Sequence, residues 1–318
     1  MTLSIRGLHL GACGAVLAAA CTPDFQSASQ VTDLRVLAIR QEAIDEPDAG
    51  SSRFADAFID LAASTVQPVR VKALVADPQP RRALAVGAHV CSPTDSGRCD
   101  VGPSLDLRAP NSSLASATEQ QPQYMLDSTR AIPPELIAGA RQDDRLKGFG
   151  GIRVQFSLEV DDGDPHGPVL ASKTLLYSTA PEAMRNQNPD IVRLEITRDG
   201  AHVATVAEGE TLAITAGVEY GVRPLLGAGT SGIEEYDAVD LSGNLVHLRE
   251  EPRYSFFATS PIDVDRDQAD EPLPGQPEPA NGIARFSTAA GPGSLWVVVR
   301  DGRGGIGWIG VRCSATPP

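Results

Sequence analysis

Basic residues are scarce in this chain of 318 residues. Lysine and arginine together number 27 against 41 aspartates and glutamates, which gives a formal net charge of −14 at pH 7. Such an acidic surface repels phosphate backbones and offers no basic patch to anionic lipids. We therefore predict no nucleic-acid partner, and attachment to a membrane only through a covalent lipid anchor.

A membrane-spanning segment is also missing from the N-terminal region, although that region is apolar. The run Leu8–Ala20 is broken only by His9 and is shorter than the about 20 residues that a spanning helix needs. Arg6 precedes it and is the only charged residue before Cys21. A cationic start, a short apolar run and a small-residue end are typical of a secretory signal.

The end of this signal resembles the lipobox of bacterial lipoproteins, in which cleavage leaves an acylated cysteine at the new N-terminus. Ala19 and Ala20 precede Cys21 as in that motif, but Ala18 stands where leucine is usual. The segment 10–13 fits the motif better, yet its apolar run of about six residues is below the roughly 7–15 of a working signal. An ordinary cleaved signal is the alternative.

These features predict a signal peptide over residues 1–20 and a lipidated tether over residues 21–30. Lipidation at Cys21 would place the protein in the cell envelope, at the outer membrane or on the periplasmic face. Acyl chains on this one residue would supply the membrane affinity.

Cysteine is rare as well, with five in the chain. Cys91 and Cys99 flank a segment rich in turn-forming residues, and their spacing suits no zinc motif. An oxidising compartment favours a disulfide between them that closes a small loop, with two free thiols as the alternative. Cys313 is left without a partner, and we assign it no role.

Familiar catalytic motifs are missing. The sequence has no H-E-x-x-H or G-x-S-x-G pattern, and no histidine beyond Cys21 lies next to an obvious nucleophile. Segments 227–232 and 302–307 match the dinucleotide pattern G-x-G-x-x-G, but neither is followed by a helical pattern, which pyrophosphate binding would need. We predict no catalytic residues and no enzymatic activity. A hydrolase with a loop-built site is the alternative.

What the sequence does contain is alternation of apolar and polar residues in short segments between turn formers. This period of two predicts antiparallel sheets that are covered on one face. In the first half we expect one helix near 133–141 and irregular structure over 92–128. The strands expected there are 31–40, 69–75, 84–91, 152–160 and 169–178.

The polar, proline-bounded segment 179–189 is the best linker candidate, and a second series of strands follows it. The expected strands are 191–196, 212–217, 221–226, 243–249, 254–259, 282–287, 294–300 and 305–312. Seven or eight short strands in about 130 residues fit an immunoglobulin-like sandwich. Asp301–Gly305 would join the last two as a hairpin.

The fold class predicted is therefore all-β. It comprises two tandem immunoglobulin-like β-sandwich domains, with one short helix in the first. The predicted boundaries are 31–180 for the first domain, 181–189 for the linker and 190–318 for the second domain.

The segment 261–281 is rich in acids and prolines, and we expect it to be a solvated loop. Within it, Asp263, Asp265 and Asp267 repeat the opening of an EF-hand, but the glycine and glutamate that the hand needs are replaced. A looser calcium cage is one hypothesis for this loop, and a purely solvating role is the other. We expect no other cofactor.

Trp296 and Trp308 lie in adjacent predicted strands. Core or cross-strand packing explains them best, and an aromatic platform for a sugar or peptide is the alternative.

The segment 295–308 resembles the terminal hairpin of immunoglobulin-like domains in uncharacterised lipoproteins of myxobacterial type. Segments 34–39 and 71–78 are similar to the opening strands of their first domain, whereas 41–44 departs from a Glu-Pro-Pro run that is commoner there. The resemblance implies the fold and an envelope location, and it lends no activity. We expect a membrane-anchored binding, adhesion or structural module with a protein or glycan partner. An accessory subunit of a surface or secretion complex is another reading.

Overall fold

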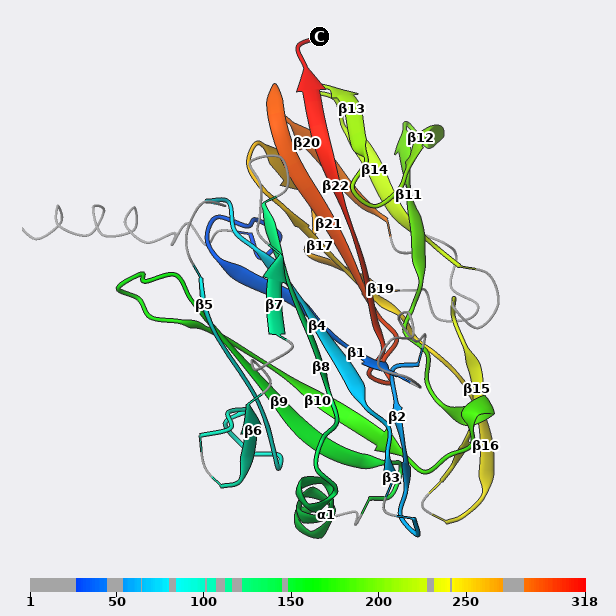
Figure 1. Ribbon diagram of the computed structural model, residues 1–318. Coiled ribbons are helices and arrows are strands. Elements are labelled where there is room, and N and C mark those ends of the chain that lie inside the picture. The colour runs from blue at the N-terminus through cyan, green and yellow to red at the C-terminus, as the bar shows by residue number, and fades with distance from the viewer. Residues whose placement is uncertain are drawn as a thin grey trace, which may run out of the picture.

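The computed structural model describes residues 27–44, 54–63, 65–79, 84–100, 102–106, 112–115, 122–144, 148–227, 232–240, 242–270 and 283–318 (Figure 1). The predicted signal peptide and Cys21 lie outside these residues. The described residues form two β-sandwiches, followed in chain order from blue to red in Figure 1.

The first sandwich packs a four-stranded sheet against a six-stranded one. The four-stranded sheet has the order β1-β4-β8-β7, with β1 Arg35–Ala43, β4 Val69–Ala76, β7 Ser112–Ala115 and β8 Gln123–Arg130. The six-stranded sheet has the order β3-β2-β10-β9-β5-β6. Its strands are β2 Ala57–Asp60, β3 Thr65–Val66, β5 Ala85–Cys91, β6 Ser104–Asp106, β9 Ile152–Asp161 and β10 Val169–Ser178. Helix α1 (Pro134–Asp143) packs against β9.

The second sandwich packs two five-stranded sheets. One has the order β12-β11-β14-β20-β18, with β11 Ile191–Arg198, β12 Ala201–Val206, β14 Tyr220–Leu226, β18 Ile262–Val264 and β20 Ala284–Thr288. The other has the order β13-β22-β21-β17-β19, with β13 Thr211–Thr215, β17 Arg253–Ala258, β19 Gln268–Asp270, β21 Gly291–Arg300 and β22 Ile306–Thr316. A separate hairpin joins β15 (Glu235–Val239) to β16 (Leu245–Arg249).

The predicted fold class is correct: the chain is all-β and forms two tandem immunoglobulin-like sandwiches with one short helix in the first. In β9, Val154, Phe156 and Leu158 alternate with polar residues and are fully buried in the first core. Strand β9 pairs antiparallel with β10, and the predicted hairpin joins β21 to β22 through Asp301–Gly305.

Two segments that were expected to be irregular contain strands. The stretch 92–128 includes β6, β7 and most of β8. The alternation of β8 is hard to recognise, because few of its buried side chains are apolar and Ser128 occupies one buried position. In the expected loop 261–281, β18 and β19 each form a sheet edge, where three residues of pairing suffice, and residues 271–281 lie outside the described part of the chain.

The two sandwiches are packed face to face through β-sheets. In β21, Leu295, Val297 and Val299 point into the second core, while Trp296 and Val298 point the other way and contact the first domain. Their partners there include Leu37 of β1, Leu74 of β4 and Met125 of β8. The molecule is therefore a stack of four sheets with three apolar layers between them.

The N-terminal end of the first domain is also bound to the second. Val31 N donates to Ala258 O at 2.8 Å, and Ala258 N donates to Ser29 O at 2.8 Å. Gln30 adds a side-chain bond to Ile262 O, and Ser29 is fully buried. Ser29 and Gln30, the last two residues of the predicted tether over 21–30, therefore belong to the folded body, because backbone groups at the end of β17 bind this segment.

Candidate functional site

The junction between the two sandwiches holds the most unusual chemistry of the molecule, and it begins with Trp296. Its indole is 1% exposed, and its Nε1 donates to Gln123 Oε1 of the first domain at 2.7 Å. A Cβ added at Gly310 would approach the indole Cδ1 to 2.8 Å. Glycine at this position of β22 therefore makes room for the ring to lie across the strand.

The second tryptophan contacts the same interface through a cation. The Arg40 guanidinium lies 4.5 Å from the Trp308 ring centroid, an arrangement that stabilises a partly desolvated arginine. Arg40 and Lys72 both pair with Glu42, at 2.6 and 3.1 Å, and that carboxylate is 2% exposed. Both tryptophans thus contribute to interdomain packing, which agrees with the packing interpretation. The aromatic-platform alternative needs an exposed ring, and the buried ring of Trp296 does not provide one.

The linker is not a free connection. Arg185, Asn186, Gln187 and Asn188 are all buried, and Asn188 joins the domains by donating to Gln41 O at 2.8 Å and accepting from Ile306 N at 3.0 Å. The polar composition that marked this segment as a linker reflects hydrogen bonding inside the interface.

A cluster of charged residues surrounds this linker, with Arg303 at its centre. Its Nη1 atom lies 2.9 Å from Glu234 Oε2 and 3.3 Å from Glu250 Oε1, and its guanidinium stacks over Tyr236 at 3.7 Å. Nη2 also donates to Met184 O at 3.4 Å. One arginine therefore ties the base of the β15–β16 hairpin to the β21–β22 turn and to the end of η1 (Glu182–Met184).

Two aspartates complete the cluster. Asp301 Oδ1 accepts from the backbone N–H groups of Arg303, Gly304 and Gly305 at 2.7–2.9 Å, while its Oδ2 accepts from Asn186 Nδ2 at 2.8 Å. From the first domain, Asp56 Oδ2 accepts from Asn186 N at 3.2 Å. Four carboxyl groups from three parts of the chain thus meet at one buried junction.

Burial governs the protonation of these four groups. Desolvation raises the pKa of Asp56 to about 6 and that of Glu250 to about 8, and it also raises the pKa values of Glu234 and Asp301. Hydrogen bonds and the charge of Arg303 act in the opposite direction without cancelling the effect.

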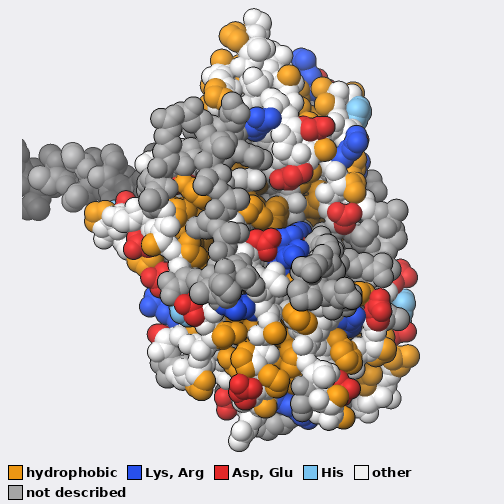
Figure 2. All heavy atoms as spheres, viewed as in Figure 1, with side chains coloured by type: hydrophobic (Ala, Val, Ile, Leu, Met, Phe, Trp, Pro, Cys, Tyr) orange, Lys and Arg blue, Asp and Glu red, His pale blue; other side chains and the backbone are white. Residues whose placement is uncertain are grey.

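Two of the larger grooves in the described part of the chain lie outside this cluster. One, of about 880 Å³, lies where Val31 and Thr32 meet β21 and β22, and Pro78, Pro122 and Pro292 line it together with Arg312. The other, of about 510 Å³, lies between α1 and the β2–β3 hairpin and has an apolar lining that includes Ile59, Leu61 and Ile137. Figure 2 shows hydrophobic side chains gathered over this lower part of the molecule, where Figure 1 places α1 and β3.

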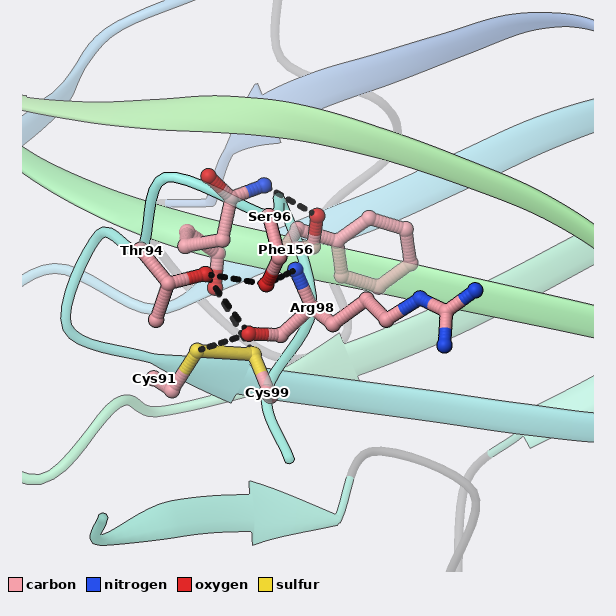
Figure 3. The surroundings of a disulfide bond; sticks show 7 residues. Cys91, Thr94, Ser96, Arg98, Cys99 and Phe156 are labelled. Carbon is pink, nitrogen blue, oxygen red and sulfur yellow. Dashed lines mark hydrogen bonds between the residues drawn. A yellow bond between two sulfur atoms is a disulfide. The ribbon is translucent and has the colours of Figure 1, made fainter. Parts of the chain in front are cut away.

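The structure contains the disulfide between Cys91 and Cys99 that the spacing predicted (Figure 3). Thr94 Oγ1 donates to Arg98 O at 2.8 Å across the loop, so the turn is braced from inside as well as closed by sulfur. The third cysteine, Cys313, is a buried free thiol, and burial raises its pKa to about 12.

The calcium candidates do not converge. Asp263 is exposed on β18, and Asp265 Oδ1 accepts from Arg285 N at 2.8 Å and also pairs with Arg266. Asp267 uses its backbone carbonyl to bind Phe256 N at 3.0 Å. Among the described residues, no three histidine, cysteine or carboxylate side chains are arranged to hold a metal ion.

Two of the histidines lie on the surface, each beside a polar side chain. His247 Nδ1 is 3.0 Å from Asp237 Oδ1, and His202 Nε2 is 2.9 Å from Thr205 Oγ1. Neither pair lies among the residues that line the two grooves. The glycine motif 302–307 spans the turn between β21 and β22 and the first two residues of β22. Residues 228–231 of the other motif lie outside the described residues.

Sequence reasoning missed the charged junction. The sequence offered one signal. Glu234 and Glu250 stand on either side of an alternating segment, as two residues at the base of a hairpin do. Nothing in the local sequence indicates that Arg303, more than fifty residues away, lies between them.

Neither protein-family models nor curated proteins gave a match to this chain. Among solved structures, chimeric titin Z1Z2 functionalized with a KLER exogenous peptide from decorin is 10% identical to this chain, with a TM-score of 0.17. The match covers 78% of this chain and 88% of the titin chain. The N-terminal Ig1-2 module of Drosophila receptor protein tyrosine phosphatase DLAR is 8% identical, with coverages of 89% and 99% and a TM-score of 0.24. Red sea bream transglutaminase is 11% identical, with coverages of 90% and 32% and a TM-score of 0.24. At these scores the likenesses carry no argument about activity, and the fold assignment rests on the sheets themselves.

No helix in the described part of the chain has the length and apolar character needed to cross a bilayer.

Proposed function

We propose that this protein is a lipid-anchored, non-catalytic binding module of the cell envelope, which acts as one rigid body formed by its two immunoglobulin-like domains. The observation that carries the proposal is the pair of hydrogen bonds between Ser29, Val31 and Ala258. They fix the start of the folded body eight residues after Cys21. Fully extended, those residues reach at most about 28 Å, so an acylated Cys21 would keep the body beside the membrane.

The surface available to a partner supports a binding role. Loops and edges of a sandwich host binding sites while the sheets supply a rigid scaffold. Here the β15–β16 hairpin projects as a two-stranded ribbon, with Val239 47% and Leu245 66% exposed. Exposed apolar residues in the second domain favour a protein partner over a glycan.

The anchor is tested by expressing the full-length chain in a bacterium that processes lipoproteins and separating the extract between detergent and aqueous phases. We expect the wild-type protein in the detergent phase and Cys21→Ala in the aqueous phase. Cys313→Ala is the matched control, since Cys313 is buried in β22 and its loss leaves the anchor intact. Wild-type protein in the aqueous phase, or membrane retention of Cys21→Ala, would refute the anchor.

Binding is tested on the same lipidated protein by chemical cross-linking in its native envelope. We expect one recurrent protein cross-linked to residues of the hairpin or of the groove of about 880 Å³ beside Val31 and Thr32. Cross-links spread evenly over the surface would contradict a dedicated binding module.

A further inference from the structure

The geometry of the charged junction carries an inference beyond binding. We propose that Arg303 and the carboxyl pair Glu234–Glu250 form a proton-dependent latch, which holds the β15–β16 hairpin against the interdomain junction and weakens as the pH rises. The inference concerns the hairpin itself and does not depend on the lipid anchor.

The latch connects the hairpin to the body near the base of the hairpin. Glu250 N donates to Glu234 O at 2.9 Å, and Glu234 N donates to Glu250 Oε2 at 3.0 Å, so the two residues close the base of the hairpin. Beyond this base, neither β15 nor β16 pairs with any other strand among the described residues. A two-stranded ribbon alone is marginally stable in water, so its position depends on the contacts at its base.

The two carboxyl groups are too close and too buried to carry two full charges. Their residues are 7% and 5% exposed, their side chains hydrogen-bond each other, and both face the same Nη1 atom of Arg303. With one shared proton, the pair carries one negative charge that Arg303 balances. With the proton removed, two like charges lie side by side in a desolvated site, and one of them lacks a counter-ion.

Other charged groups around the pair do not supply that counter-ion. Asp301, in the same turn as Arg303, is negative and opposes ionisation of both glutamates. Farther out, Asp56 adds a fourth carboxyl group, and Arg185 is stacked on Phe54 at 4.3 Å. Lys173 of β10 reaches Gly304 O at 2.6 Å and interacts with Asp301. The junction therefore has a surplus of carboxyl groups, and uptake of a proton neutralises one of them.

The direction of the pH effect follows from the raised pKa of Glu250. In the latched state this pKa is about 8, whereas in a released hairpin the carboxyl group returns toward its ordinary value of 4.5. The latched state therefore binds the proton more tightly, and its advantage declines as the pH rises from about 4.5 to about 8. Between pH 6 and pH 9 the population of the released hairpin should rise on the order of 10- to 100-fold.

The test is hydrogen–deuterium exchange of the whole folded protein at several pH values from 6 to 9, with each rate divided by the intrinsic rate at that pH. We expect protection of the amides in β15 and β16 to fall by about 10-fold or more over this range. At every pH it should stay below the protection of β21 and β22, because the hairpin opens without global unfolding. Glu250→Gln cannot ionise and should make hairpin protection independent of pH. Glu235→Gln is the matched control, because Glu235 lies on the same hairpin with its side chain 67% exposed, and this variant should behave as wild type.

Three results would overturn the proposal. Wild-type hairpin protection that does not change with pH removes the latch, and so does a Glu250→Gln variant with the wild-type pH dependence. Hairpin amides as protected as those of β21 and β22 at every pH assign the effect to global unfolding. Should Glu250→Gln fail to fold, the wild-type profile and Glu234→Gln decide the question.

Discussion

Replacing Trp296 by alanine should separate the two domains energetically. The side chain is 1% exposed and packs in the apolar layer between β21 and the first domain, so its removal leaves a cavity at the centre of the interface. Truncation of a buried tryptophan to alanine costs about 3–5 kcal/mol. About 1 kcal/mol of this belongs to the hydrogen bond that Gln123 Oε1 loses.

The protein carries its own probe for this experiment, since its two tryptophans, Trp296 and Trp308, both lie at the junction. Tryptophan fluorescence thus reports the interface, and far-ultraviolet circular dichroism reports all the sheets. In urea, the wild-type signals should change together, because the shared layer couples the domains. In Trp296→Ala, the fluorescence of Trp308 should change at lower urea than the circular dichroism.

Leu245→Ala is the control, since that side chain is 66% exposed and its truncation should cost less than about 0.5 kcal/mol. A Trp296→Ala variant that loses less than about 1 kcal/mol would refute the reasoning. A single unchanged transition by both probes would do the same, because it would mean that the apolar layer does not couple the domains.

Three further predictions concern other parts of the molecule. Replacing both Cys91 and Cys99 by alanine should lower the free energy of unfolding by about 2–3 kcal/mol, as expected for so short a loop, and a urea midpoint equal to wild type would contradict this. Gly307→Ala should destabilise the protein by about 1–3 kcal/mol, because the added Cβ would lie 2.1 Å from a linker carbonyl oxygen. In the control Gly87→Ala, the nearest atom to the added Cβ lies at 3.5 Å, so its thermal melt should differ little from that of the wild type. The free energy of unfolding should fall by about 1–2 kcal/mol from pH 6 to pH 8. Glu250 has a pKa of about 8 in the folded protein and therefore binds its proton more tightly there than in the unfolded chain. A free energy of unfolding that does not change with pH would argue against this.

Alternation in the sequence was enough to predict the sandwich class, because a strand with one buried face shows its period directly. It was least informative where a strand is covered on both faces. In β21, residues 295–299 form an unbroken apolar run, and the run alone does not reveal that Trp296 and Val298 face another domain. The edge strands β18 and β19 were missed for the opposite reason, since three-residue pairings have too little pattern to recognise.

The functional residues were harder to predict than the fold. The disulfide is local, and its spacing and turn composition could be read directly. The charged junction joins Asp56, Glu234, Glu250 and Asp301 around Arg303, and the separations between these residues carry no periodic signal. Folding of the second domain brings Glu234, Glu250 and Asp301 to Arg303, and the packing of the first sandwich adds Asp56.

The binding of Ser29 and Val31 to Ala258 has a consequence for motion between the domains. The chain connects the two sandwiches at both ends of β17 and β21: this N-terminal segment lies at Ala258, and the buried linker lies beside the turn that begins at Asp301. A hinge requires one axis about which the rest can rotate freely. Two attachments separated along the strands leave only the line through both of them as that axis, so opening between the domains about any other axis must first peel one attachment away.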